Sequence, residues 1–224
     1  MKSPYRCFFL MALCGCQMYL SNGHNYITPP ELTENSGVLY ATCKMRPNAK
    51  LPADMPKIYG HVLFRHEYAQ AKLNVAINLQ GFPAPDEQTR AIHIHQFGDL
   101  SEGCASTGGH YNPLGVNHPQ HPGDFGNFQP SEDGKIVKML DSDATLFGGL
   151  SILGRAVVIH AKSDDMGLGG DAGSLLHGNA GARLACCVIG MSKSKLWDNN
   201  SNEEGVNKIT LSTDPLDFVT ELKE

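Results

Sequence analysis

His110 stands between two groups of side chains that could bind metal ions, and each group lacks a fourth ligand without it. One group consists of three histidines that lie upstream and far downstream: His93, His95 and His160. The other follows within one short stretch and adds a carboxylate: His118, His121 and Asp124. If His110 joins both groups, each reaches four ligands, and the sequence predicts a redox centre that holds two metal ions.

The composition and spacing of each group indicate which metal it would bind. Three imidazoles and a carboxylate, as in the group that ends at Asp124, make a closed tetrahedral zinc site. His93 and His95 are two residues apart in a strand-like run, so both rings are expected on one face. An all-imidazole set suits copper, which favours tetragonal nitrogen coordination and can change oxidation state. Taken singly, the pair could also be two surface histidines, and His160 a structural one.

His110 can serve both groups only if each of its ring nitrogens binds a metal ion, which requires the deprotonated imidazolate. Two cations favour that form, because metal ligands shed their protons on binding. If copper releases one nitrogen when it is reduced, that nitrogen takes up a proton. We therefore expect His110 to be both a ligand and a proton donor.

The elements that must position these ligands have the pattern of short β-strands. Apolar and polar residues alternate in several runs, as in residues 73–79. Their spacing, with 24 glycines and 13 prolines, predicts an antiparallel sandwich or barrel. No stretch of this domain predicts a long helix. The expected strands are residues 37–44, 58–65, 73–79, 91–97, 135–140, 155–161 and 182–189.

Two long segments between the expected strands are glycine-rich, and we expect both to be irregular. Residues 98–134 carry most of the ligand candidates, and residues 162–181 form the second segment. Structureless segments of this length are uncommon in compact domains and are usually functional.

The N-terminus has the pattern of a secretory signal, which we assign to residues 1–23. Lys2 and Arg6 precede an apolar run over residues 7–20, which is shorter than a membrane-spanning helix requires. A lipid-attachment signal around Cys14 and Cys16, or an uncleaved anchor, are the alternatives. Residues 24–36 are polar and are predicted to be a linker.

We expect one domain over residues 37–190 and a polar, acidic tail over residues 191–224. Residues 198–207 are expected to be flexible, and residues 216–222 could form a short helix. Asn199 begins a glycosylation sequon. The formal net charge of −5 argues against a nucleic-acid partner, and the acidic tail argues against strong binding of heparin-type polyanions.

The remaining chemistry of the sequence lies in its cysteines. Three leave with the predicted signal, and four remain: Cys43, Cys104, Cys186 and Cys187. Export favours disulfide bonds among them. Because neighbouring residues of a strand face opposite sides, only one of Cys186 and Cys187 can easily pair with Cys104.

Several motifs resemble the copper/zinc superoxide dismutases over about residues 37–190, and in particular their extracellular branch. Residues 91–99 (AIHIHQFGD) resemble the copper-binding signature, and residues 178–186 (GNAGARLAC) resemble the second signature. Residues 109–113 (GHYNP) and 118–124 (HPQHPGD) resemble the zinc loop. Residues 96–100 and the Cys186-Cys187 doublet are similar to the extracellular members.

The resemblance implies an all-β fold, an eight-stranded Greek-key barrel or flattened sandwich with long metal-binding and electrostatic loops. It implies one copper and one zinc per chain. Copper would bind His93, His95, His110 and His160, and zinc would bind His110, His118, His121 and Asp124. It further implies that Asp164 links a copper histidine to a zinc histidine, that Arg183 lies beside copper, and that Cys104 pairs with Cys186. Cys43 and Cys187 would then be alternative partners or free thiols.

The implied activity is the disproportionation of superoxide to oxygen and hydrogen peroxide, as antioxidant defence outside the cell. The implied partners are superoxide, copper delivered during secretion, and further copies of the chain in a dimer or tetramer. The chain departs from relatives at residues 171–174 and at Leu175 and Leu176, where intracellular members carry more charge. An inactive domain of the same fold and a secreted metal buffer are the rival functions.

Overall fold

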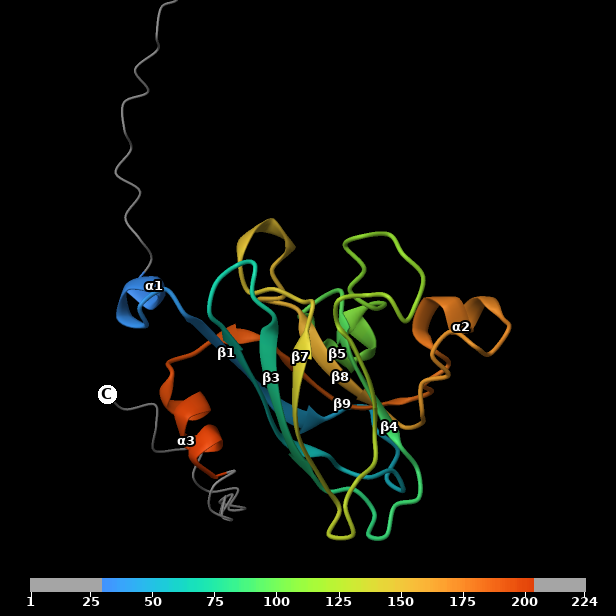
Figure 1. Ribbon diagram of the computed structural model, residues 1–224. Helices are drawn as coiled ribbons and strands as arrows, with labels where there is room; N and C mark the ends of the chain where they lie inside the picture. The colour runs from blue at the N-terminus through green and yellow to red at the C-terminus, as the bar shows by residue number, and fades with distance from the viewer. Residues whose placement is uncertain (1–29, 204–224) are drawn as a thin grey trace, which may run out of the picture.

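The computed structural model describes residues 30–203 (Figure 1). The predicted signal segment, residues 24–29 of the predicted linker, and the helix expected at residues 216–222 lie outside the described residues. No helix in the described range is long and apolar enough to cross a membrane.

The described chain is built mainly of strands, as predicted. Their bounds are β1 Leu39–Pro47, β2 Tyr59–His66, β3 Leu73–Gln80, β4 Arg90–His95, β5 Ser101–Cys104, β6 Asp124–Phe128, β7 Lys135–Ser142, β8 Ala156–His160, β9 Arg183–Val188 and β10 Gly190–Met191. The short helices are α1 Pro30–Glu34, η1 Ala105–Thr107, η2 Gly148–Leu150, α2 Ala172–His177 and α3 Lys195–Glu203.

Eight of the strands form one antiparallel sheet in the order β6-β4-β8-β9-β1-β2-β3-β7, and it curls into a nearly closed barrel (Figure 1). The chain runs through β1, β2 and β3 as neighbours and then crosses to the other side for β4. It crosses again between β6 and β7, and between β7 and β8. These crossings leave long connections at the barrel ends, and the metal-ligand candidates lie on or beside them. The prediction of an all-β barrel is confirmed.

The core follows from the alternation that predicted the strands. Val62 and Phe64 of β2 and Val75 and Ile77 of β3 point inward and are almost fully buried. Burial of a side chain of this size contributes about 1.5–3 kcal/mol. The barrel is therefore a packed scaffold that can hold ligands on neighbouring strands in fixed positions.

Three regions differ from the sequence prediction. Strands β5 and β6 lie within residues 98–134, which were expected to be irregular; β6 forms because its backbone pairs with β4. Residues 30–34 of the predicted linker form α1, and Leu32 packs against the core. Part of the expected flexible stretch belongs to α3, which packs against β2 with Trp197 partly buried. The polar composition of these segments predicted irregular structure, but contact with the barrel stabilises both helices.

Candidate metal centre

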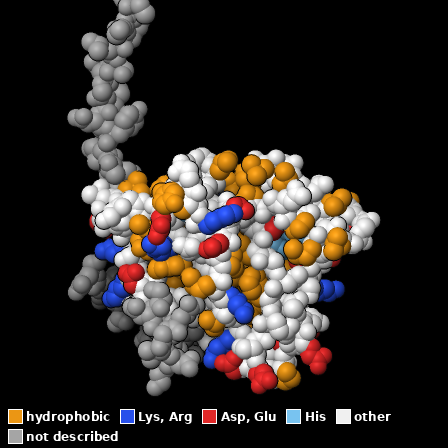
Figure 2. Space-filling view, in the orientation of Figure 1, with side chains coloured by type: hydrophobic (Ala, Val, Ile, Leu, Met, Phe, Trp, Pro, Cys, Tyr) orange, Lys and Arg blue, Asp and Glu red, His pale blue; other side chains and the backbone are white. Residues whose placement is uncertain are grey.

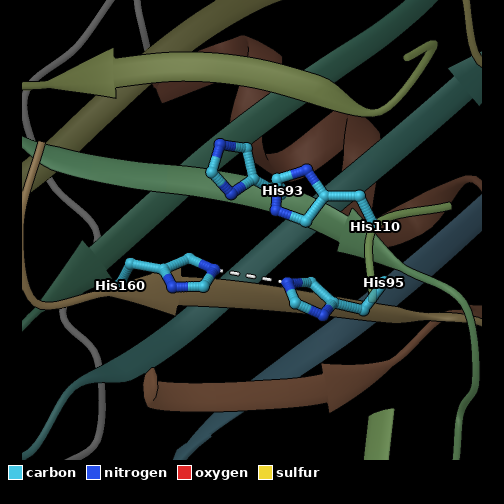
Figure 3. A group of neighbouring side chains, drawn as sticks. All are labelled: His93, His95, His110 and His160. Carbon is cyan, nitrogen blue, oxygen red and sulfur yellow. Dashed lines mark hydrogen bonds between the residues drawn. The ribbon is translucent and has the colours of Figure 1, made fainter. Parts of the chain in front are cut away.

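The four histidines of the first group come from two neighbouring strands and one loop (Figure 3). His93 and His95 lie on β4, and His160 is the last residue of β8, which pairs antiparallel with β4. His110 follows η1 and joins β4 through an isolated bridge to His95. The barrel therefore brings together residues that are up to 67 positions apart, between His93 and His160.

Two of these histidines sit at irregularities of the sheet. The register of β4 against β6 shifts between Ile92 and His93, and the register of β8 against β9 shifts between Ile159 and His160. A β-bulge bends its strand and changes the direction of a side chain. The two register shifts lie at His93 and His160, whose rings turn toward the group.

The ring nitrogens of the first group face one another. The two Nε2 atoms of His95 and His160 are 3.2 Å apart, and one potential ligand atom from each histidine lies within 4.8 Å of the others. Nδ1 of His93 and Nε2 of His110 are buried and have no hydrogen-bond partner among the described residues. Buried polar atoms are usually satisfied, so these nitrogens fit a bound cation.

Backbone carbonyls fix which nitrogens are left to face the centre. Nδ1 of His95 donates to the carbonyl of Gly108 at 3.0 Å, and Nδ1 of His160 donates to the carbonyl of Gly181 at 3.3 Å. Each bond places the proton on the outer nitrogen, so Nε2 is the free acceptor.

The second group surrounds the carboxylate of Asp124, the first residue of β6. Oδ1 lies 2.9 Å from Nδ1 of His110, and Oδ2 lies 2.7 Å from Nδ1 of His118 and 2.9 Å from Nδ1 of His121. The outer nitrogen of His121 donates to the carbonyl of Val116 at 3.1 Å. Three imidazoles and one carboxylate therefore converge, which is the donor set of a tetrahedral zinc site.

His110 belongs to both groups. Its Nδ1 faces Asp124, whereas its Nε2 is the buried, unpartnered atom on the side of His93, His95 and His160. The ring lies between the two ligand sets, with one nitrogen for each.

Asp164 links the two groups by accepting a hydrogen bond from one histidine of each. Its carboxylate accepts from Nε2 of His93 and from Nε2 of His118, both at 2.7 Å, and it is buried. Gly178 makes room for it: a Cβ at that position would lie 2.0 Å from Oδ1 of Asp164, and its φ of +62° suits glycine. The carboxylate fixes both rings, leaving Nδ1 of each toward its own group.

The protonation of these groups follows from burial and from the two carboxylates. Burial lowers the pKa of His110 to about 4, against the opposing hydrogen bond to Asp124. Burial would also lower the pKa of His118, but its hydrogen bonds to Asp124 and Asp164 raise that pKa to about 9. Burial would raise the pKa of Asp124, but the surrounding histidines hold it well below its usual range. The Asp124 carboxylate is ionised and His110 is neutral at pH 7, the forms that bind metal, whereas His118 is protonated in the metal-free protein and must release its proton to bind.

An open hollow of about 760 Å³ leads to the first group, and Arg183 lies in its wall beside His95. Burial lowers the pKa of Arg183, but a guanidinium remains charged at pH 7. The lining also includes Leu175, Leu176 and His177 of α2. Figure 2 shows hydrophobic side chains gathered in the region of α2, where Leu176 is 65% exposed. Among its lining residues the hollow therefore presents one permanent cation, beside the histidines, and two leucines of α2.

The four remaining cysteines form two disulfides. Cys104 of β5 joins Cys186 of β9, and Cys43 of β1 joins Cys187 of β9. The neighbouring cysteines point to opposite faces, as strand geometry requires: Cys43 and Cys187 belong to the main core, and Cys104 and Cys186 to a separate small cluster.

Some residues around the centre were not predicted. Asn127 holds the backbone of Asp164, Asn48 holds that of Arg183, and Gly178 admits the carboxylate of Asp164. The two asparagines have no signal of type or spacing in the sequence, because each acts on the backbone of a distant residue.

The sequence of this chain is similar to those of known proteins. The family described as copper/zinc superoxide dismutase (SODC) matches residues 58–189. Extracellular superoxide dismutase (Cu-Zn) of Rattus norvegicus is 54% identical over 167 residues, which cover 74% of this chain and 68% of the relative. The extracellular protein of Homo sapiens is 50% identical over 176 residues, covering 78% and 73%. The superoxide dismutase (Cu-Zn) of Schizosaccharomyces pombe is 43% identical over 143 residues, covering 61% and 92%.

Proposed function

The chain belongs to the copper/zinc superoxide dismutase family, and on that premise we propose that His110 is shared by a copper ion and a zinc ion in one centre. The protein is a secreted enzyme that converts superoxide to oxygen and hydrogen peroxide, and it serves antioxidant defence outside the cell. The observation that carries the proposal for the centre is the position of His110 in both ligand groups.

We assign copper to His93, His95, His110 and His160, and zinc to His110, His118, His121 and Asp124. The all-imidazole set suits copper, and the set with a carboxylate suits zinc. When bound, copper would supply the one-electron redox couple that the reaction needs, and zinc a fixed positive charge that shapes the loop.

The chain itself attracts the substrate and supplies a proton. Two superoxide anions and two protons give one oxygen and one hydrogen peroxide, so each turnover brings anions and protons into the hollow. Arg183 is the cation in its wall, and a guanidinium attracts and transiently holds a small anion. Nε2 of His110 is the nitrogen that would carry a proton to the second anion, while Nδ1, which faces Asp124, belongs to the zinc group.

Asp164 fixes the relative positions of the two histidine groups. Because one carboxylate holds His93 and His118 at 2.7 Å each, neither ring can turn without disturbing the other group. We propose that Asp164 keeps both rings in the same orientation during turnover.

The rival functions make different demands on these residues. A metal buffer needs neither a shared ring nor a cation in an open hollow, whereas His110 and Arg183 provide both. An inactive domain of the same fold would not need a complete all-imidazole set.

Metal analysis of the secreted protein, combined with an assay of superoxide dismutation, tests the proposal. We expect copper and zinc near one each per chain and activity that cyanide inhibits. Zinc without copper, or full copper without turnover, would contradict it.

We further propose that the enzyme forms a homo-oligomer, a dimer or a tetramer. Phe97, Leu150 and Val188 are 49%, 52% and 38% exposed. A Cβ on Gly98 would contact both Gly154 and Val188, so these segments lie side by side. Exposed apolar side chains on adjoining segments favour association with a second copy. Measurement of the molecular mass in solution tests the proposed oligomer. The variant Phe97→Ser should reduce that mass.

Three further proposals concern delivery and the ends of the chain. Copper is acquired during secretion, the acidic tail does not bind heparin-type polyanions strongly, and Asn199 carries a glycan. Asn199 is exposed on α3. A mass shift that glycosidase removes, and that Asn199→Gln abolishes, would identify the glycan. We also propose that the signal spans residues 1–23, the linker 24–36, the domain 37–190 and the tail 191–224.

A further inference from the structure

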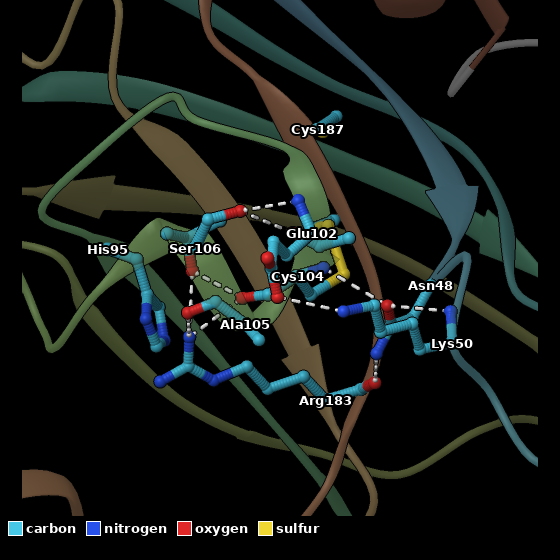
Figure 4. Close-up of a disulfide and its surroundings, with 12 residues drawn as sticks. Asn48, Lys50, His95, Glu102, Cys104, Ala105, Ser106, Arg183 and Cys187 are labelled. Carbon is cyan, nitrogen blue, oxygen red and sulfur yellow. Dashed lines mark hydrogen bonds and ion pairs between the residues drawn. A yellow bond between two sulfur atoms is a disulfide. The ribbon is translucent and has the colours of Figure 1, made fainter.

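The side-chain amide of Asn48, just beyond the end of β1, joins two segments that are far apart in the sequence (Figure 4). Its Nδ2 donates to the backbone carbonyl of Arg183 at 3.0 Å. Its Oδ1 accepts from the backbone N–H of Cys104 at 3.0 Å. One neutral amide therefore ties the start of β9 to the end of β5.

One of these segments carries Arg183, and the other contains the groups that accept hydrogen bonds from its guanidinium. Nη1 donates to the carbonyl of Cys104 at 2.8 Å and to Oγ1 of Thr107 at 2.9 Å, and Nη2 donates to the carbonyl of Gly108 at 2.7 Å. Residues 104–108 thus form the seat of the guanidinium. Asn48 fixes that seat at Cys104, and fixes the backbone from which the Arg183 side chain extends.

The seat is also connected to the first histidine group. The carbonyl of Gly108 accepts from Nη2 of Arg183 and from Nδ1 of His95. A shift of residues 104–108 would therefore move the cation and a proposed copper ligand together.

The surroundings of Asn48 are shaped to receive it. Gly103 adopts a φ of +67°, and a Cβ there would lie 2.3 Å from Oδ1 of Asn48. The backbone N–H of Asn48 donates to the carbonyl of Leu184 at 2.9 Å, which brings the residue against β9. The nearby ion pair of Lys50 with Glu102 is more than 60% exposed on both sides, and exposed pairs contribute little. Asn48 is the polar side chain that contacts both segments at once.

We propose that Asn48 is a positioning residue that sets where the positive charge of Arg183 lies in the hollow, and so sets the affinity of the site for small anions. It acts through Arg183 and touches neither the substrate nor a proposed metal ligand. The inference rests on the proposed function, because it assumes that the hollow receives a monoanion.

The test measures anion binding as well as turnover. Azide is a small monoanion that ligates Cu(II) and changes its absorption, so its dissociation constant can be titrated in the metal-loaded enzyme. We expect Asn48→Ala to weaken azide binding about 3–10-fold and to lower kcat/KM by a similar factor, with copper and zinc content unchanged. Asn74→Ala is the matched control: Asn74 also lies on the barrel and uses its amide to donate to Asp141 and accept from Arg65, and its loss should leave azide binding unchanged.

A double-mutant cycle separates positioning from a general structural effect. In the Arg183→Ile background, Asn48→Ala should have no further effect on azide binding, because Asn48 acts through Arg183. Asn48→Ser, whose hydroxyl is too short to join both segments, carries the same expectation and replaces Asn48→Ala if that variant does not fold.

Two results would overturn the inference: unchanged azide binding in both Asn48 variants, or the same weakening with Arg183 absent. A wild-type enzyme that binds copper and zinc but does not turn over superoxide would instead refute the proposed function.

Discussion

The side chain of Asn127 holds the backbone of Asp164 through two hydrogen bonds, one in each direction. Its Nδ2 donates to the Asp164 carbonyl at 2.8 Å, and its Oδ1 accepts from the Asp164 N–H at 2.7 Å. Asn127 lies on β6, the strand that begins with Asp124. One short strand therefore supplies a proposed zinc ligand and anchors the carboxylate that joins the two histidine groups.

Removing His110 should disturb both metals, whereas removing His160 should mainly affect copper. His110 belongs to both groups, and His160 to the first alone. We expect His110→Ala to lower zinc occupancy and alter the copper spectrum together, and His160→Ala to leave zinc nearly full. Metal analysis with electron paramagnetic resonance measures both, and full zinc with an unchanged copper spectrum in His110→Ala would exclude a shared ligand.

Arg183→Ile should lower turnover without removing copper. The guanidinium is the permanent charge in the wall of the hollow, and electrostatic steering changes association rates by roughly 10–10³-fold. We expect kcat/KM to fall about 10-fold or more and to become less dependent on ionic strength. Unchanged turnover at full copper content would rule out the steering role.

Gly178→Ala should destabilise the centre more than a left-handed backbone alone explains. A Cβ at Gly178 would overlap Oδ1 of Asp164, whereas Gly170 has a similar φ of +77° and open space around it. We expect Gly170→Ala to cost about 1–2 kcal/mol, and Gly178→Ala to cost more and weaken zinc binding about 10–100-fold. Thermal unfolding and the rate of zinc release to a chelator measure the difference; equal effects would mean that Asp164 is not displaced.

The stability of the metal-free protein should fall as the pH rises from neutral to alkaline. The pKa of His118 is raised to about 9 by Asp124 and Asp164, against the opposing effect of burial, while the unfolded chain has a value of about 6.5. The stabilisation is fully present below pH ~6.5 and is lost as the pH rises through about 9.

At one pKa unit per ~1.4 kcal/mol, His118 contributes up to about 3 kcal/mol. Urea unfolding from pH 6 to 10 measures it, with His118→Gln as the control that should lack this slope. If both proteins lose stability in parallel, another group is responsible.

The two disulfides should contribute differently to stability and to anion binding. Loss of either costs about 2–5 kcal/mol in the chain-entropy view. Cys43 and Cys187 lie in the core, so replacing both by Ala should lower the melting temperature and leave azide affinity unchanged. Replacing Cys104 and Cys186 should change both, because the Cys104 carbonyl receives the Arg183 guanidinium. Equal azide affinities in the two variants would contradict this distinction.

The sequence predicted most of the barrel because alternation of apolar and polar residues is a local signal. It placed β3 at residues 73–79, one residue short of its observed end at Gln80. It missed β6, whose run Asp124–Phe128 contains a glycine and little alternation, and which becomes a strand only by pairing with β4.

The histidines could be predicted because their type and spacing carry the chemistry. Asn48 and Asn127 could not, because each makes its contacts across a large sequence separation: 135 residues for the bond from Asn48 to Arg183. An asparagine that binds a distant backbone has the same local sequence as one in a surface turn. Such residues become visible only when the fold brings the two segments together.

The disulfide pattern has a consequence for biosynthesis. Cys43 and Cys104 enter the secretory compartment long before Cys187 and Cys186, which are 144 and 82 residues beyond their respective partners. Until the last strands emerge, Cys43 and Cys104 are the only cysteines of the domain in the compartment. Each can then pair only with the other or with an external thiol. A bond formed early between Cys43 and Cys104 would have to be reduced or exchanged before both observed disulfides could form.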